Sequence, residues 1–288
     1  MLKKQSDDTP TGKIGDRIQK VLSQLGLGSR RQVETWISEG RVRVNGKLAN
    51  LGDRLKGTDQ LVLNGRPVDL LKRIGQPLRV LVYYKPEGEL VTRRDPKARP
   101  VIFTQLPRLK HARWIAVGRL DINTQGLLIV TNNGELANRL MHPSRQIERE
   151  YAVRILGQVS EEVISNLRSG VLLDDGEARF EDIQTAGGEG ANRWYKVVLR
   201  EGRNRIVRRL WESQGLMVSR LIRVRYGPAL LPVNLKPRTF YELKDQEKSI
   251  LMECVGMQHD RTEGHDITER RQRPGSKRRT TASRRKEK

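Results

Sequence analysis

The sequence is poor in cysteine and in long apolar runs, and each shortage excludes whole classes of protein. Cys254 is the only cysteine in 288 residues. One thiol cannot form an internal disulfide, a zinc ribbon or an iron–sulfur cluster, so these classes are excluded. The longest apolar runs have about five residues, whereas a membrane-spanning helix needs about 20. The first residues lack the apolar segment of a signal peptide. We therefore expect a soluble protein of a reducing compartment, most simply the cytoplasm.

Acidic residues are few relative to basic ones. The chain has 56 lysines and arginines against 34 aspartates and glutamates, which gives a formal net charge of +22. Segment 13–75 carries +7, and segment 270–288 carries +9 without any Leu, Ile, Val or Phe. This excess favours a polyanionic partner such as nucleic acid over a merely solvated surface, and no basic amphipathic helix points to a membrane. The final segment is expected to be disordered.

Common nucleotide, metal and hydrolase motifs are absent from the sequence. It contains no P-loop, no dinucleotide-binding glycine fingerprint and no Gly-x-Ser-x-Gly elbow, and its four histidines lack metal-ligand spacing. Segment 121–126 fits part of a calcium-binding loop, but Asn132 stands where a bidentate glutamate is required. We therefore do not expect metal-dependent, NTP-dependent or serine-hydrolase chemistry.

Length and composition predict two folded domains between two tails. We expect a flexible N-terminus at 1–12 and a small basic domain at 13–75. A larger domain should follow at 76–257, and a disordered basic tail at 258–288.

The larger domain mixes strand patterns with helix patterns. Segments 149–156 and 218–226 read as strands, whereas 160–167 reads as a helix capped by Ser160. The spacing is not the regular one of a parallel βαβ fold. The predicted fold class is therefore α+β, with a largely antiparallel mixed sheet.

The small domain has clear helix and turn signals. Apolar residues at helical spacing predict a helix over 18–25. Ser29, with Gln32 three residues later, forms a capping box for a second helix. The dipeptide Asn45-Gly46 is typical of a hairpin turn. These signals predict two consecutive helices followed by a hairpin.

Arg30 and Arg31 fall in the first turn of the second predicted helix. The helix dipole disfavours cations at this end by a few tenths of a kcal/mol. A bound phosphate would turn the conflict into a binding site, because helix amides and guanidinium groups would share the anion. From these residues alone, solvated arginines and a phosphate site are equally acceptable.

Three stretches of the small domain resemble the S4 RNA-binding domain. They are Arg-Ile-Gln-Lys-Val-Leu from Arg17, Gly-Ser-Arg-Arg-Gln-Val-Glu from Gly28, and Gly-Arg-Val-Arg-Val-Asn-Gly-Lys from Gly40. The resemblance implies a helix pair and a small sheet that grip structured RNA. Carried onto this chain, it implies RNA contacts by Arg17, Lys20, Ser29, Arg30, Arg31, Arg41 and Lys47.

A single carboxylate, Asp121, is the candidate for chemistry in the larger domain. It follows an apolar strand pattern and has basic residues around it. The ordinary interpretation is a turn aspartate that bonds to its own backbone. The functional alternative is a catalytic carboxylate beside a guanidinium. The local pattern leaves both open.

The segment around Asp121 resembles the Arg-Leu-Asp-x-x-Thr-x-Gly-Leu-Leu signature of pseudouridine synthases. Three further stretches follow the order of that family: Lys-Pro-Glu-Gly from Lys85, Glu-Arg-Glu-Tyr-Ala-Val from Glu148, and Glu-Gly-Arg-Asn-Arg-Ile-Val-Arg-Arg-Leu from Glu201. With the S4 module in front, the resemblance covers about 245 residues. It implies an RNA pseudouridine synthase of the ribosomal RNA branch.

The resemblance also implies roles for individual residues. The reaction breaks the C1′–N1 bond of uridine, rotates the uracil and rejoins it through C5, with no cofactor or metal. Asp121 would be the catalytic carboxylate, Arg208 its ion-pair partner, and Tyr151 the ring that stacks on the target base. Arg119 and Thr124 are expected to bind phosphate or shape the loop.

The sequence departs from the family pattern at Arg205-Ile206, where many relatives have His-Gln. The family's detailed contacts are therefore not carried over here, and Arg205 is expected only to bind RNA. The departure does not affect the assignment of Asp121.

The resemblance further implies a substrate and an oligomeric state. The target would be one uridine in a 23S rRNA stem-loop near the peptidyl-transferase region, and the enzyme would act as a monomer without a membrane partner. The competing class is a non-catalytic RNA-binding or ribosome-associated protein, which needs only the S4 module and the basic tail. A nuclease or glycosylase ranks third, because metal ligands and a base-excising motif are missing.

Overall fold

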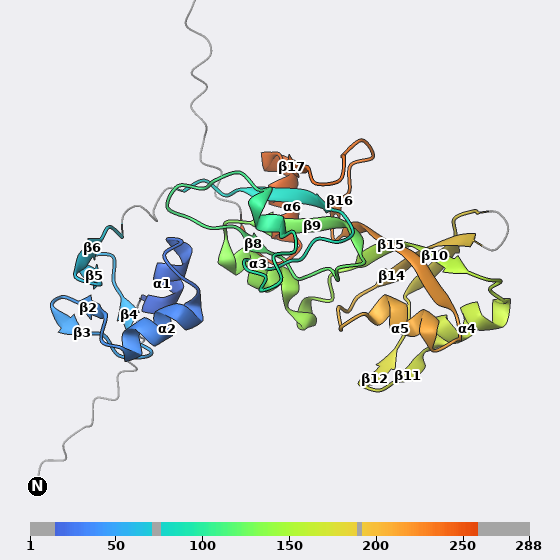
Figure 1. Cartoon of the computed structure of the whole chain (residues 1–288), viewed down its shortest axis with the longest axis horizontal. Helices are drawn as coiled ribbons and strands as arrows, with labels where there is room; N and C mark the ends of the chain where they lie inside the picture. Colours follow the sequence, from blue (N-terminus) through green and yellow to red (C-terminus); the bar gives the residue numbers. More distant parts are fainter. Residues whose placement is uncertain (1–14, 71–75, 189–191, 259–288) are drawn as a thin grey trace, which may run out of the picture. The chain divides into compact units, whose positions relative to one another are not determined.

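The computed structural model describes residues 15–70, 76–188 and 192–258 (Figure 1). The expected flexible N-terminus and almost all of the expected disordered tail lie outside these residues. No helix of the described part has the length and apolar character needed to cross a membrane.

The N-terminal part packs two short helices and small sheets around an apolar core of its own. The helices are α1 (Ile18–Gln24) and α2 (Arg30–Ser38), and fully buried Ile18, Leu22 and Val33 lie in the core. A four-stranded antiparallel sheet has the order β3-β2-β5-β6, and β1 pairs with β4. The bounds of β1 to β6 are Asp16–Arg17, Val42–Val44, Lys47–Leu48, Arg54–Leu55, Leu61–Leu63 and Arg66–Val68. This is the helix pair and small sheet that the S4 resemblance implies.

The predicted start of α2 is confirmed. The Gln32 backbone N–H donates to Ser29 Oγ at 3.1 Å, and the Ser29 backbone N–H donates to Gln32 Oε1 at 3.0 Å. The predicted hairpin is also present, because β2 turns into β3 through Asn45 and Gly46, both with positive φ.

The larger part is built on a nine-stranded sheet with the order β13-β14-β10-β15-β9-β7-β17, to which β16 and β8 add. All neighbours are antiparallel except β9 and β15. In chain order the strands are β7 (Val80–Lys85), β8 (Ile115–Ala116), β9 (Gln125–Thr131), β10 (Arg149–Leu156), β13 (Asp182–Thr185), β14 (Asn192–Leu199), β15 (Met217–Tyr226), β16 (Ala229–Leu230) and β17 (Phe240–Glu242). The predicted α+β class with a largely antiparallel mixed sheet is confirmed.

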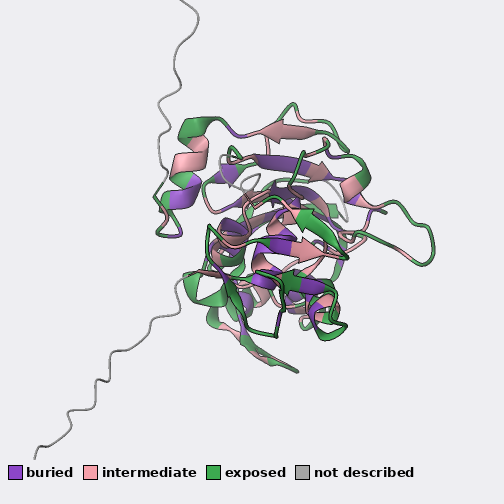
Figure 2. Cartoon of the chain, turned by 90° about the vertical axis from the view of Figure 1, so that its left-hand side faces the viewer, coloured by how far each residue is buried: buried purple, intermediate pink, exposed green. Residues whose placement is uncertain are grey.

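Alternate residues of the central strands β7 and β9 enter two separate apolar cores. Leu81 and Leu128 belong to the core that includes α4 and α5, whereas Val82 and Leu127 belong to the core that includes α3 and α6. The helix bounds are Gly134–Met141 for α3, Glu161–Ser169 for α4, Ile206–Glu212 for α5 and Asp245–Glu253 for α6. Buried residues follow the strands of the sheet, and exposed ones gather in loops and turns (Figure 2). The sheet is therefore covered on both faces.

A hairpin of β11 (Val171–Leu173) and β12 (Gly176–Ala178) follows α4, and the sequence patterns do not predict it. Two arginines near α5 fasten its turn. Arg203 Nη1 donates to Asp175 Oδ1 at 2.9 Å, and Arg209 Nη1 donates to Asp175 Oδ2 at 2.9 Å. These ion pairs fix the hairpin against α5, through Arg209, and against the segment before it, through Arg203.

Candidate active site

A cavity of about 1100 Å³ opens where the central strands meet the loop before β9 and the loop before α5. Five residues predicted for the site line it, namely Arg119, Asp121, Thr124, Tyr151 and Arg205. The volume lies slightly above the usual range for small-molecule sites, so a nucleotide can enter. The structure therefore gathers these residues from three separate segments of the sequence around one space.

Lys85 fixes the loop that carries Asp121. Its side chain is fully buried at the end of β7. Its Nζ donates to the carbonyl oxygens of Thr124 at 2.8 Å, Pro86 at 3.0 Å and Ile122 at 3.4 Å. The ammonium group thus holds the loop by its backbone on both sides of residue 123.

The buried position makes the ammonium group of Lys85 easier to deprotonate. Burial lowers its pKa to about 8, because desolvation disfavours the charged form. Three carboxylates oppose this shift, those of Glu89, Asp121 and Glu87. Asp121 therefore lies close enough to the ammonium group for a direct electrostatic interaction.

Arg208 holds the same loop from α5. It is 7% exposed, and it donates from Nη1 to the Val218 carbonyl oxygen at 2.8 Å and from Nη2 to the Asn123 carbonyl oxygen at 3.0 Å. Burial lowers the pKa of this guanidinium, the nearby Arg205 lowers it further, and Asp121 raises it.

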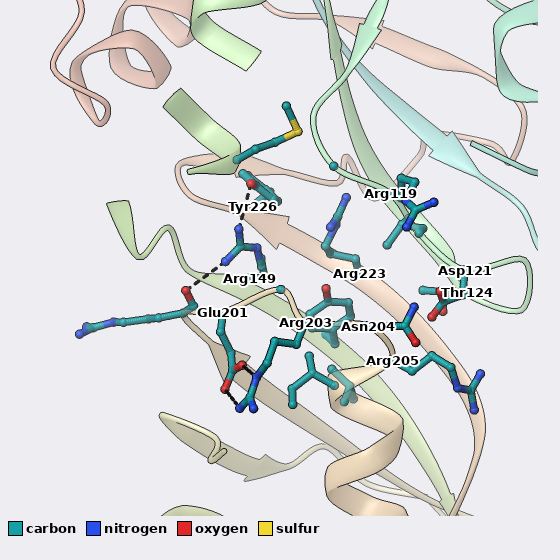
Figure 3. A pocket seen from close by; sticks show the side chains of 18 of the residues that line it. Arg119, Asp121, Thr124, Arg149, Glu201, Arg203, Asn204, Arg205, Arg223 and Tyr226 are labelled. Atoms are coloured by element: carbon teal, nitrogen blue, oxygen red, sulfur yellow. Dashed lines mark hydrogen bonds and ion pairs between the residues drawn. The ribbon is translucent and has the colours of Figure 1, made fainter. Parts of the chain in front are cut away.

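The prediction of an ion pair between Arg208 and Asp121 is wrong, because the structure does not contain this pair. The Arg208 side chain donates hydrogen bonds to main-chain carbonyl oxygens, and it forms no salt bridge with the Asp121 carboxylate. Arg208 therefore positions the loop and attracts Asp121 only through space, while the carboxylate faces the cavity (Figure 3).

A glycine lets two strands approach each other beside the loop. β9 runs parallel to β15 at the pair Gly126 and Arg223. Gly126 has a φ of +103°, and a Cβ at this position would lie 2.2 Å from the Arg223 carbonyl oxygen. Only glycine fits such a contact in this conformation. It brings β15, with Arg223, next to the loop that carries Asp121.

The other predicted cavity residues differ in burial. Tyr151 on β10 is 8% exposed, and Thr124 is buried, with no partner for Oγ1 within the described part. Arg119 is exposed, and Arg205 stands at the start of α5 with positive φ and pairs with Glu212 at 3.3 Å. Their roles in stacking and RNA binding stay predictions.

The residues predicted to bind RNA in the S4 domain also differ in exposure. Five are exposed, namely Arg17, Arg30, Arg31, Arg41 and Lys47, and two are half-buried, namely Lys20 and Ser29. Lys20 pairs with Asp16 at 2.7 Å, Ser29 caps α2, and Arg41 donates to Asn64 at 2.7 Å. Arg30 and Arg31 occupy the first turn of α2, as predicted. Their contact with phosphate stays a prediction.

Sequence reasoning missed four residues of the site: Lys85, Arg149, Arg223 and Tyr226. Lys85 and Arg149 lie within stretches that resemble the family, and the other two lie in the strand pattern at 218–226. Their sequence positions were visible, but their burial depends on which strands become neighbours. Within 15–70, 76–188 and 192–258, no group of three or more His, Cys, Asp or Glu side chains could hold a metal ion.

Two protein-family models match the chain. The S4 domain model matches residues 16–61, and the model described as RNA pseudouridylate synthase matches residues 79–213. A solved structure described as a pseudouridylate synthase shares the fold, with a TM-score of 0.57 and 22% identity over 82% of this chain and 99% of that one. The synthase match disfavours the alternative of a non-catalytic S4 protein.

Close relatives carry the name ribosomal large subunit pseudouridine synthase B. The one from Pseudomonas aeruginosa is 56% identical over 255 residues, which cover 87% of this chain and 66% of the relative. The one from Haemophilus influenzae is 53% identical over 265 residues, 91% of this chain and 74% of the relative. The one from Escherichia coli K12 is 54% identical over 244 residues, 84% of each chain. This chain therefore belongs to the family of ribosomal large subunit pseudouridine synthases.

Proposed function

We propose that this chain isomerises one uridine of large-subunit ribosomal RNA to pseudouridine, with Asp121 as the catalytic carboxylate. The carrying observation is the position of Asp121, on a loop that Lys85 and Arg208 hold by its carbonyl oxygens at the wall of a cavity large enough for a nucleotide. Because neither cation occupies the carboxylate oxygens, these stay available to a substrate.

The proposed reaction rearranges bonds without changing composition. The C1′–N1 bond breaks, the uracil turns, and C5 bonds to C1′. N1 gains a proton and C5 loses one, so the base keeps its formula. Since no electron or phosphoryl group is transferred, we propose that the reaction uses neither a metal ion nor a cofactor.

The target nucleotide must leave its helical stack to reach the cavity, which costs a few kcal/mol. We propose that Tyr151 stacks on the extruded uracil and recovers part of this cost. Exposed Arg119 and Arg205 line the same cavity and can hold the flanking backbone. Thr124 lies within the loop and would shape it.

The S4 domain would supply affinity for structured RNA, mainly through Arg30 and Arg31 at the start of α2. The proposed target is one uridine in a 23S rRNA stem-loop near the peptidyl-transferase region. We further propose that the protein acts as a monomer in the cytoplasm, where its rRNA substrate is assembled.

The test is Asp121→Asn, which removes the charge and keeps the size. We expect this variant to bind large-subunit rRNA like the unaltered protein and to release no tritium from rRNA labelled at uridine C5. Asp182→Asn removes a carboxylate on β13 outside the cavity and should keep full release. Tritium release by Asp121→Asn at the normal rate would contradict the catalytic assignment.

A further inference from the structure

Two buried arginines, Arg149 and Arg223, line the cavity without any carboxylate partner. They are 8% and 3% exposed, and neither forms a salt bridge with a residue that the structure describes. They flank Tyr226, and each guanidinium carbon lies 5.0 Å from the centroid of its ring. In Figure 3, Arg223 stands between Tyr226 and the side of the cavity that holds Arg119 and Asp121.

Most hydrogen-bond donors of Arg223 are unused. A guanidinium has five N–H donors. Within the described residues only Nε of Arg223 has an acceptor, the Leu127 carbonyl oxygen at 2.8 Å, and Nη2 is buried without a partner. Among the residues that the structure describes, Arg149 has only neutral acceptors, namely the carbonyl oxygens of Ile147 and Arg200 and the hydroxyl of Tyr226.

Buried charges of this kind are costly unless an opposite charge meets them. The ring of Tyr226 offsets only part of the cost of burying these charges, because it carries no net charge. Besides Asp121, three carboxylates belong to the cavity wall: Glu201 pairs with Arg203, Glu181 pairs with Arg179, and Glu177 is exposed to solvent. The cavity therefore keeps buried positive charge that an anion from outside can neutralise.

We infer that Arg149 and Arg223 form a phosphate subsite, which binds a phosphodiester group of the RNA next to the target uridine. The inference rests on the proposed function, because it takes RNA as the substrate. Phosphate oxygens accept several guanidinium donors at once, and arginine matches their geometry in a forked arrangement. A backbone phosphate held here would keep the adjoining sugar beside Asp121, which lines the same cavity.

The first test is Arg223→Gln in an Asp121→Asn background, so that bound RNA is not converted. Binding to an unmodified large-subunit rRNA transcript is measured over a series of KCl concentrations. We expect about tenfold weaker binding at low salt and a log–log salt slope smaller by about 0.7, as for one lost phosphate contact. Arg220→Gln removes the same charge from β15 outside the cavity and should leave the slope unchanged.

The second test changes the RNA instead of the protein. A neutral methylphosphonate replaces one of the two phosphodiesters that flank the target uridine, one linkage at a time. With Arg223 present, one of these linkages should weaken binding about tenfold. With Arg223→Gln, the same linkage should cause no further loss, because the two changes remove one interaction.

The outcomes separate this subsite from the proposed function. If Arg223→Gln melts at the same temperature as the unaltered protein, it is folded. Unchanged RNA affinity and salt slope of this folded variant would then overturn the subsite. If Arg223→Gln does not fold, the methylphosphonates decide alone, and unchanged affinity at both linkages overturns it. An active Asp121→Asn would refute the catalytic assignment, whereas the binding measurements would still decide the subsite.

Discussion

Lys85 and Arg208 hold the loop of Asp121 by its backbone and not by its carboxylate. Lys85 Nζ bonds to the Thr124 carbonyl oxygen, and Arg208 Nη2 bonds to the Asn123 carbonyl oxygen. Carbonyl acceptors carry no net charge, so both cations keep an attraction for nearby anions, Asp121 among them, in the buried site. At the scale of residues, the site thus combines a fixed loop with open carboxylate oxygens.

The lowered pKa of Lys85 makes stability depend on pH. Its pKa is about 8 in the folded chain against 10.5 without burial, so between these values the unfolded chain binds more protons and the free energy of unfolding rises with pH. Below this window both states are protonated, and the full cost of burying the charge is present. In the unaltered protein, the free energy of unfolding should rise by at most about 3 kcal/mol across this window. We expect Lys85→Met to abolish that rise, and urea unfolding at several pH values measures it.

An exposed lysine provides the control for this experiment. Lys97→Met removes an ammonium group that is exposed to solvent, so it should leave the pH dependence intact. Parallel stability–pH curves for the unaltered protein and Lys85→Met would contradict the account of Lys85.

Motif positions could predict which residues share the site, but not where their side chains point. Asp121, Thr124 and Tyr151 were expected together, and they line one cavity. The ion pair of Arg208 with Asp121 was expected too, yet the guanidinium turns to main-chain carbonyl oxygens. Side-chain direction depends on tertiary packing, which a motif does not contain.

At the scale of elements, strong local signals predicted structure and weak ones did not. The capping box at Ser29 and the strand at 149–156 appear where expected. The hairpin of β11 and β12 was missed, because its strands have three residues each and Leu172 is 83% exposed. Ion pairs to Asp175 from distant arginines hold it, and no local pattern shows them.

The parallel contact between β9 and β15 yields a prediction about Gly126. Gly126→Ala would place a Cβ 2.2 Å from the Arg223 carbonyl oxygen, so the strands must separate. We expect a loss of stability of about 3 kcal/mol or more, together with reduced tritium release. Thermal melting and the release assay measure both effects.

The matched control for this variant is Gly46→Ala. Gly46 also has positive φ, but no atom lies within 4 Å of its added Cβ. The expected cost is therefore only about 1–2 kcal/mol. An equal cost at the two glycines would show that close strand approach does not matter at Gly126.

At the scale of the whole molecule, positive charge is divided between surfaces and the interior. The net charge is +22, and Arg30 and Arg31 place part of it at an exposed helix start. Inside the described part, the buried charged residues are four cations and one carboxylate, namely Lys85, Arg149, Arg208, Arg223 and Glu89. Net charge alone could predict a polyanionic partner, but only the fold shows how much of the charge is buried.

The exposed part of this charge can be tested on the S4 domain. Arg30→Glu combined with Arg31→Glu should weaken binding to large-subunit rRNA and flatten its salt dependence, because fewer counterions are released. Arg193→Glu with Lys196→Glu makes the same charge change on β14 and should have a smaller effect. An unchanged salt slope for the Arg30 and Arg31 variant would show that this helix start does not contact phosphate.

The most direct measurement of the central claim is a map of pseudouridines in rRNA from cells that lack this protein. We expect one pseudouridine of 23S rRNA to be missing and the other sites to be unchanged. The unaltered protein should restore that site, and Asp121→Asn, expressed at the same level, should not. A complete set of pseudouridines without the protein, or restoration by Asp121→Asn, would contradict the account.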